Sequence, residues 1–354
     1  MREWFINDNE IKAYNGTRTD VVIPQEIYGE IIEAIGDFAF SPNKEKVKEE
    51  TSNVRRQITR VILPDGITRI GTAAFSGCAS LKEIVIPKSV VSIGDNAFDG
   101  CISLENVIVP PNVDFGLNVF HNCTALKRFS FPQSYTSTPI RFFQNCISIE
   151  EVELPPNLLV VGCGTFDNCK SLKNLVIPAS VKTLEDYAFG GCTSFEKIII
   201  PDGVTELKAH LFNGCTQIRE VLLPNNLRKI HQWAFRGCTL LKSIELPEGL
   251  QEIDAEAFEY SGLESITIPA SVETIYSSSF KNCQELKRII FKGNETTIKD
   301  EPRYLRQGKG WSATVSMLPD QTDFPNLESI VIAGCAGSYA ESYASKYGIR
   351  FEFN

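Results

Sequence analysis

A repeat of 22 or 23 residues runs through most of this chain and constrains its fold more than any other feature. Two copies, residues 73–94 (AAFSGCASLKEIVIPKSVVSIG) and 96–113 (NAFDGCISLENVIVPPNV), carry Phe, Cys, Leu, Ile and Pro at the same offsets. The repeat prolines are Pro64, Pro87, Pro110, Pro132, Pro155, Pro178, Pro201, Pro224, Pro247 and Pro269. A unit this short cannot bury its apolar face alone, so the copies must stack into a solenoid that presents much surface.

Each copy contains one short strand. In residues 81–87 (LKEIVIP), Ile84 and Ile86 alternate with Val85, which is the period of a β-strand with one buried face. Pro87 donates no ladder hydrogen bond and therefore ends the strand. The DNAF segment at residues 95–98 is interpreted as a short helical turn that carries Phe98 inward.

One phenylalanine per copy occupies the same slot. A buried ring in every coil would be the largest single apolar contribution of each unit. An exposed aromatic stripe that stacks on sugar or nucleic acid is the alternative. These residues are Phe75, Phe98, Phe120, Phe143, Phe166, Phe189, Phe212, Phe235, Phe258 and Phe280.

Nine of the eleven cysteines lie three residues after that phenylalanine. Disulfide frameworks usually join irregularly spaced cysteines, and zinc needs ligands that converge on a tetrahedron. A straight column of one cysteine per coil instead favours small buried thiols, although some disulfides or a metal or redox role stay open. The nine are Cys78, Cys101, Cys123, Cys146, Cys169, Cys192, Cys215, Cys238 and Cys283.

These motifs resemble the BspA-like, or Treponema-type, leucine-rich repeat, whose consensus is close to LxxIxLPxxLxxIgxxAFxxCxx. The resemblance covers the chain from about residue 20 to the C-terminus. It implies a mainly-β fold, a right-handed curved solenoid of about a dozen repeats with one parallel β-sheet on its concave side. It also implies a bacterial surface or secreted adhesion protein that binds host or partner proteins and is not an enzyme.

The ends of a solenoid need caps because the terminal coils would otherwise expose the core. Residues 1–20 are predicted to form a hairpin cap, residues 21–332 the solenoid, and residues 333–354 a cap of helix and strand. Ser338 and Glu341 form a capping box at the start of that helix. Two charged insertions, near residues 41–57 and 296–325, interrupt the period, the first as a loop or a short solvated helix.

No feature indicates catalysis. The three histidines occupy different slots, and no nucleophile elbow, HExxH or phosphate-binding glycine loop is present. We therefore expect no enzyme activity and no cofactor or metal, and a small-molecule substrate is disfavoured. A net charge of −9 and a pI near 5.1 argue against nucleic acid as a partner. No apolar run is long enough to span a bilayer.

Outward positions on the strands are the candidate protein-binding site. Their middle column is mostly aliphatic and lies beside a column of charges that alternate in sign. An extended exposed apolar patch often marks an interface, although β-propensity alone could also explain it. The predicted contacts are Val85, Ile108, Val176, Ile199, Leu222, Glu245 and Ile290 on the concave face, with Tyr304 and Trp311 in the second insertion.

Location and partner stay open at this level. The N-terminus has no apolar core of a signal peptide, so the chain is either cytoplasmic or its leader lies outside this sequence. The leading interpretation is a surface recognition module that binds a protein. The alternatives are an intracellular scaffold or assembly subunit and, less favoured because the outward strand columns lack aromatic residues, a carbohydrate-binding module.

Overall fold

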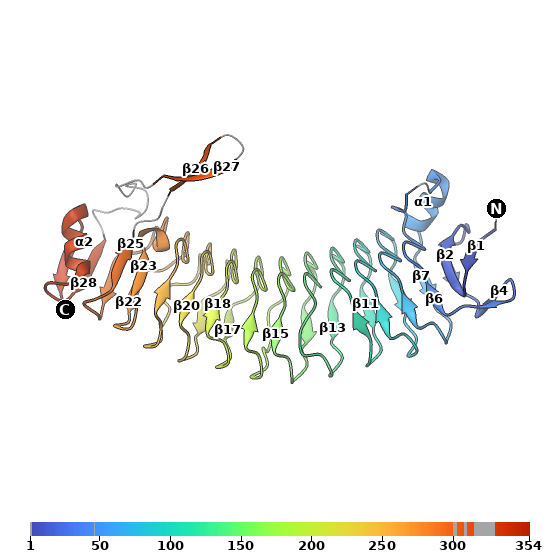
Figure 1. The fold of residues 1–354 in the computed structure, drawn as a ribbon, viewed down its shortest axis with the longest axis horizontal. Coiled ribbons are helices and arrows are strands. Elements are labelled where there is room, and N and C mark those ends of the chain that lie inside the picture. The colour runs from blue at the N-terminus through green and yellow to red at the C-terminus, as the bar shows by residue number, and fades with distance from the viewer. Residues whose placement is uncertain (1, 46, 300–302, 308–309, 315–329) are drawn as a thin grey trace. The chain divides into compact units, whose positions relative to one another are not determined.

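The structure is a computed structural model that describes residues 2–45, 47–299, 303–307, 310–314 and 330–354. The chain divides into two compact units, Met1–Ser180 and Val181–Asn354. In each unit the chain forms successive coils that stack side by side (Figure 1). The fold is a mainly-β parallel solenoid, as the repeat predicts.

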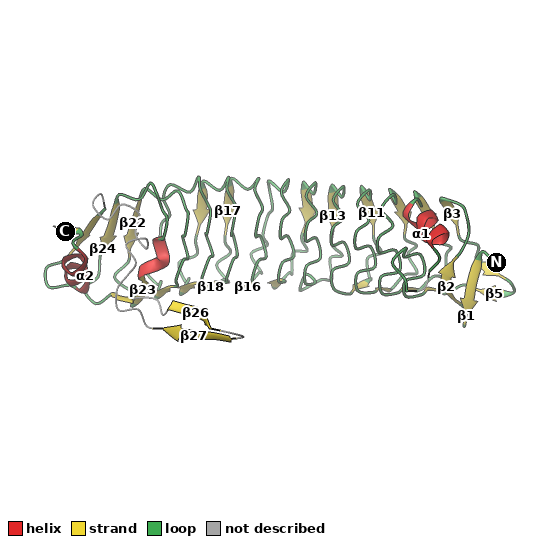
Figure 2. Cartoon of the chain, turned by 90° about the horizontal axis from the view of Figure 1, so that it is seen from above, coloured by secondary structure: helices red, strands yellow, loops and turns green. Residues whose placement is uncertain are grey.

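The coils of the first unit carry strands on two sides (Figure 2). The predicted LxxIxI segments form the first row, in which the first four strands make one parallel sheet. The second apolar pair of each repeat also forms strands, so a second row runs along the other side. The first row contains β3 (Asp20–Val22), β7 (Arg60–Ile62), β9 (Glu83–Val85), β11 (Asn106–Ile108), β13 (Arg128–Ser130) and β14 (Glu151–Glu153). The second contains β6 (Ala34–Ile35), β8 (Arg69–Ile70), β10 (Ser92–Ile93), β12 (Asp114–Phe115) and β15 (Val160–Val161).

A hairpin of β1 (Trp4–Asn7) and β2 (Glu10–Tyr14) begins the chain. Its turn residues Asp8 and Asn9 both have positive φ, 54° and 60°, which suits the twist of a two-residue hairpin. Strand β2 pairs in parallel with β6, so the hairpin extends the second row and covers the first coil. A smaller hairpin of β4 (Glu26–Ile27) and β5 (Glu30–Ile31) follows.

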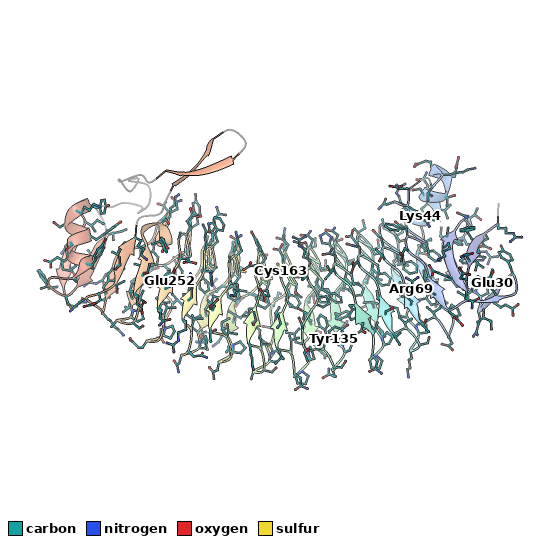
Figure 3. The ribbon with its side chains drawn as sticks, viewed as in Figure 1. Glu30, Lys44, Arg69, Tyr135, Cys163 and Glu252 are labelled. Carbon is teal, nitrogen blue, oxygen red and sulfur yellow. The ribbon has the colours of Figure 1, made fainter. Side chains whose placement is uncertain are left out.

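The first insertion contains helix α1 (Glu49–Arg56), whose inner face is buried. The sequence suggested a solvated segment, but Arg55 is fully buried. Its guanidinium donates to the carbonyl oxygen of Tyr14 through Nε at 2.9 Å and Nη2 at 2.7 Å, and to that of Ser41 through Nη1 at 2.7 Å. Lys44, labelled beside α1 in Figure 3, donates to the Lys12 carbonyl oxygen at 2.7 Å. The insertion is therefore joined to the first coils by buried hydrogen bonds.

The repeat phenylalanines are buried and stack from coil to coil within each unit. Neighbouring ring centroids lie 5.4 Å apart between Phe75 and Phe98, and 5.2 Å apart between Phe235 and Phe258. The segment around each ring is a pair of turns in most coils, where the sequence suggested a helical turn. In one coil, for example, Asn96 and Gly100 flank Phe98 with φ of 56° and 71°. A left-handed residue on each side reverses the chain within a few residues.

The column cysteines are buried thiols that bond to the preceding coil. Eight Sγ atoms lie 3.0–3.3 Å from the carbonyl oxygen of that coil's phenylalanine. Burial raises the pKa of Cys78 to about 12 and that of Cys283 to about 11. A thiol in this position fills a tight turn and donates a weak hydrogen bond.

The second unit repeats the same two-sided arrangement. Its first row contains β17 (Lys197–Ile199), β19 (Glu220–Leu222), β22 (Ser265–Ile268), β24 (Arg288–Phe291), β28 (Val331–Gly334) and β29 (Arg350–Phe353). Its second row contains β16 (Thr183–Leu184), β18 (Glu206–Leu207), β20 (Lys229–Ile230), β21 (Glu252–Ile253), β23 (Thr274–Tyr276) and β25 (Thr297–Lys299). A 3-10 helix, η1 (Ser277–Phe280), replaces the turns in one coil.

Helix α2 (Tyr339–Tyr347) covers the last coils of the second unit. Ser338 Oγ accepts a hydrogen bond from the Glu341 amide at 3.2 Å, as the predicted capping box requires. The Glu341 carboxylate reaches the amide of Gly337 at 2.6 Å rather than that of Ser338. Gly348 ends the helix in the left-handed conformation, with φ of 69°.

Candidate protein-binding faces

An aliphatic ladder lies on the outward face of the four-stranded sheet of the first unit. Val22 on β3, Ile62 on β7, Val85 on β9 and Ile108 on β11 are direct neighbours in the sheet register. The exposed fractions are 59% for Val22, 47% for Val85 and 84% for Ile108, and Ile62 is partly exposed. Inward neighbours such as Ile84 are buried, so strand alternation explains which side chains reach solvent.

Charged side chains beside the ladder pair with their neighbours along the row. Arg60 Nε lies 3.7 Å from a Glu83 carboxylate oxygen, and Lys127 Nζ lies 3.2 Å from a Glu105 carboxylate oxygen. Opposite charges on adjacent strands attract, although exposed pairs contribute only a few tenths of a kcal/mol each. The ladder thus forms an apolar strip whose flanking charges largely neutralise one another.

The second unit has a shorter aliphatic strip. Ile199 on β17 and Leu222 on β19 are register partners, with exposed fractions of 60% and 43%. Lys197 and Glu220, two residues earlier on these strands, form an ion pair with a Nζ–Oε1 distance of 2.8 Å. An open depression lies beside β19, and its lining includes Arg219, Leu222, Asn225, Glu245 and Glu248.

The remaining predicted contacts lie in varied surroundings. Val176 is 83% exposed, in a segment of the first unit that is not a regular strand. Glu245 is exposed in a similar segment of the second unit, and Ile290 on β24 is partly exposed. Tyr304 lies on β26 (Arg303–Gln307) and Trp311 on β27 (Gly310–Thr314), which pair as a hairpin. The side chains of these two residues lie outside the described part of the structure.

One aromatic cluster of the second unit was missed by the sequence analysis. Tyr187, His210 and Trp233 occupy one slot in successive coils, two residues before the repeat phenylalanine, and all have φ near 60°. The Tyr187 and His210 centroids lie 4.0 Å apart with nearly parallel rings, and those of His210 and Trp233 lie 4.5 Å apart. His210 lies between the other two rings, so both of its faces are covered within the stack. The sequence feature that could have revealed this cluster is the repeat position that the three aromatic residues share.

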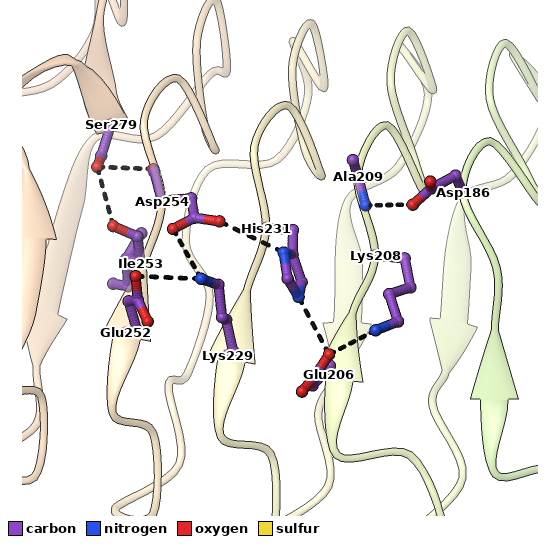
Figure 4. Close-up of polar contacts among 10 residues, drawn as sticks. All are labelled: Asp186, Glu206, Lys208, Ala209, Lys229, His231, Glu252, Ile253, Asp254 and Ser279. Carbon is purple, nitrogen blue, oxygen red and sulfur yellow. Dashed lines mark hydrogen bonds and ion pairs between the residues drawn. The ribbon is translucent and has the colours of Figure 1, made fainter. Parts of the chain in front are cut away.

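A polar network covers part of the second strand row of this unit (Figure 4). His231 lies between two carboxylates, with Nε2 at 3.1 Å from Glu206 and Nδ1 at 3.4 Å from Asp254. Hydrogen bonding to Asp254, and then to Glu206, raises the pKa of His231 above its usual value. Lys208 and Lys229 complete the network with ion pairs to Glu206 and Asp254. The side chains satisfy one another, which indicates a stabilising role.

Neither a metal-ligand group nor a membrane-spanning helix is found among the described residues. Across that part of the chain, no three His, Cys, Asp or Glu side chains are grouped to hold a metal ion. No helix there has the length and apolar character needed to cross a membrane.

The sequence profile of the "BspA type Leucine rich repeat region (6 copies)" matches residues 45–173, 140–232 and 159–287, which together exceed half of the chain. The chain belongs to the BspA-type leucine-rich repeat family. No curated protein matches it.

Solved structures of bacterial leucine-rich repeat proteins are similar to the chain. A leucine-rich cell surface protein from Faecalibacterium prausnitzii is 25% identical with a TM-score of 0.53, and the match covers 82% of this chain and 93% of that one. A leucine-rich repeat protein from Bacteroides ovatus is 24% identical with a TM-score of 0.64, covering 100% and 99%. The pneumococcal vaccine antigen PcpA is 18% identical with a TM-score of 0.56, covering 98% and 91%. The last two likenesses concern the fold alone.

Proposed function

We propose that this BspA-type leucine-rich repeat protein is a non-enzymatic recognition module that binds a protein partner at the bacterial surface or after secretion. The observation that carries the proposal is the set of exposed aliphatic side chains held on rigid strands, above all Ile199 and Leu222 in the second unit. Apolar side chains on a regular scaffold lose little conformational entropy when a partner covers them. The similarity to a cell surface protein of Faecalibacterium prausnitzii supports the location.

The contact in the second unit combines an apolar centre with a charged rim. Ile199 and Leu222 form the centre, and the Lys197–Glu220 pair and Glu245 lie around it. Interfaces commonly place a few buried apolar anchors inside a polar rim that excludes water. Val85, Ile108 and Val176 of the first unit, Ile290, and the Tyr304 and Trp311 hairpin are proposed as further contacts.

The test replaces Ile199 and Leu222 together with lysine. Each lysine would place an unpaired charge at the centre of the interface, so we expect capture of the partner to fall at least tenfold. Immobilised chain is incubated with solubilised host extracellular matrix and with lysate of the producing bacterium, and bound proteins are identified by mass spectrometry. The control variant carries Thr205→Lys and Gln251→Lys, both exposed on another side of the coils, Thr205 in the coil of Ile199 and Gln251 in the coil that follows that of Leu222. Identical capture by all three proteins would contradict the proposal.

An intracellular scaffold is the second candidate. The observation that favours it is the column of cysteines whose Sγ atoms contact backbone carbonyl oxygens, a geometry that requires the reduced thiol. A reducing compartment preserves that state. Capture restricted to proteins of the bacterium's own lysate would favour this candidate over surface recognition.

A further inference from the structure

The outward face of the first unit is complementary to itself. Its sheet has the strand order β11-β9-β7-β3, and the outward side chains form three columns that cross the four strands, two within the strands and one just before them. The first column contains Asp20, Arg60, Glu83 and Asn106, and the second is the aliphatic ladder of Val22, Ile62, Val85 and Ile108.

A two-fold axis parallel to the strands and midway between β7 and β9 would bring two such faces together. This operation reverses the order of the strands and keeps the position along each strand. Ile62 of one copy then meets Val85 of the other, and Val22 meets Ile108. Every aliphatic residue of the ladder faces another aliphatic residue, as an isologous interface requires.

The same operation also matches the charges. Arg60 of one copy faces Glu83 of the other, and Asp20 faces the uncharged Asn106. In the neighbouring outward column, Lys82 faces Thr59 and Glu105 faces Thr19, so no like charges meet. An axis on β7 or on β9 would place Arg60 or Glu83 against its own copy, which is repulsive. An axis midway between β3 and β7 would pair Asp20 with Arg60 but would overlap only those two strands of the sheet. The central axis therefore gives the largest overlap of the sheet without like charges in contact.

We propose that the chain forms a two-fold symmetric homodimer through this face, with the aliphatic ladders packed against each other. The dimer does not use Ile199 and Leu222 of the second unit, but it covers Val85 and Ile108, so a second copy and a protein partner would compete for these two residues. Four strands about 4.8 Å apart, with three outward positions each, give a patch of about 20 Å by 10 Å. Two such patches bury about 400 Å² together, well below the roughly 1,200 Å² at which stable interfaces begin, so we expect a weak dimer that forms only at high micromolar concentration.

Sedimentation velocity of the full chain between low and high micromolar concentration tests the proposal. The wild type should shift toward the dimer as concentration rises. Val85→Lys should weaken association at least tenfold, because the two-fold axis places the substitution in the interface twice. Ile199→Lys, on the second unit, is the matched control and should leave association unchanged. A wild type that stays monomeric throughout, or equal effects of both substitutions, would overturn the proposal.

Charge exchange tests the alignment. Arg60→Glu places two glutamates in contact across the interface and should weaken association, and Arg60→Glu combined with Glu83→Arg should restore it. Cysteine cross-linking gives an independent readout. Val22→Cys mixed with Ile108→Cys should form a disulfide-linked dimer, whereas Val22→Cys alone should not exceed the wild-type background. Cross-linking of Val22→Cys with itself would show a different arrangement and refute this one.

Discussion

At the residue scale, two histidines of the second unit show how neighbours set the properties of a side chain. Hydrogen bonds to Asp254 and Glu206 raise the pKa of His231. Burial between the rings of Tyr187 and Trp233 lowers the pKa of His210, because desolvation disfavours the charged form. The two histidines occupy different slots of the repeat, and the neighbours of each one set the direction of its pKa shift.

Replacing each histidine should lower the unfolding free energy by an amount that depends on pH, and the two residues should show opposite pH dependence. A raised pKa means that the stabilisation by His231 is complete below about pH 6.5, the unfolded value, and is lost as pH rises through the folded pKa. We therefore expect His231→Gln to lower the unfolding free energy by about 1 kcal/mol near pH 5.5 and by less near pH 8.5. His210→Gln should be more costly at pH 8.5 than at pH 5.5.

Urea unfolding of both variants and the wild type at the two pH values measures these differences. The opposite response of the two variants controls for any general effect of pH on the chain. A larger loss for His231→Gln at pH 8.5 than at pH 5.5 would contradict the assigned role of the network.

At the element scale, α1 depends on a buried cation. A helix of eight residues gains little stability by itself, so its position must come from tertiary contacts. Arg55 supplies them through three hydrogen bonds to the carbonyl oxygens of Tyr14 and Ser41. Burial lowers the pKa of Arg55 to about 10, which leaves the guanidinium charged at neutral pH.

Removing this cation should loosen the N-terminal coils. Arg55→Met leaves the two carbonyl groups without their donor, and we expect a loss of about 3 kcal/mol in local stability. The neighbouring Arg56 is exposed, so Arg56→Met should change stability by less than about 0.5 kcal/mol. Hydrogen–deuterium exchange of the amides of β2 and α1 measures both effects. Equal protection in the two variants would show that the buried hydrogen bonds are not what holds the helix.

At the scale of the whole molecule, the reactivity of the column cysteines reports whether each unit is folded. Cys78, Cys101, Cys123, Cys146 and Cys169 belong to the first unit, and Cys192, Cys215, Cys238 and Cys283 to the second. All nine are buried, whereas Cys163 and Cys335 are partly exposed. Because the thiolate is the reactive form, burial and a raised pKa both suppress reaction.

Thiol labelling should therefore follow unfolding. In the native chain at pH 7, iodoacetamide should modify Cys163 and Cys335, while the nine column cysteines react at least 100-fold more slowly. In denaturant all eleven should react. Mass spectrometry of labelled peptides across a urea series then reports the unfolding of each unit separately. Fast native labelling throughout the column would contradict its burial.

The repeat period was enough to predict the solenoid and the first strand row. These features depend on local chemistry that recurs in each copy, such as the alternation in residues 81–87. The second strand row was not predicted, because two-residue strands carry almost no periodic signal. The buried side of α1 was missed because its charged composition suggested solvent.

The exposed aliphatic residues of the candidate binding surface could be predicted from the sequence only in part. Strand alternation indicated which residues point outward, and it placed Val85, Ile108, Ile199 and Leu222 among exposed side chains. The ladder also includes Val22 on β3, which the sequence analysis did not place among the partner contacts, and only the register of β3 with β7 brings it beside Ile62. Hydrogen-bonded register is a property of the assembled sheet.

The sequence by itself determined the coil: its length, its buried phenylalanine and cysteine, and the strand that proline ends. Those choices depend on interactions within one repeat and its immediate copy, so a single period carries them. Only the tertiary structure decided how side chains from different coils combine, as in the buried Arg55, the His231 network and the aliphatic ladder. These combinations depend on which residues the stacking brings within a few ångströms, and sequence separations of 20 to 40 residues do not reveal that distance.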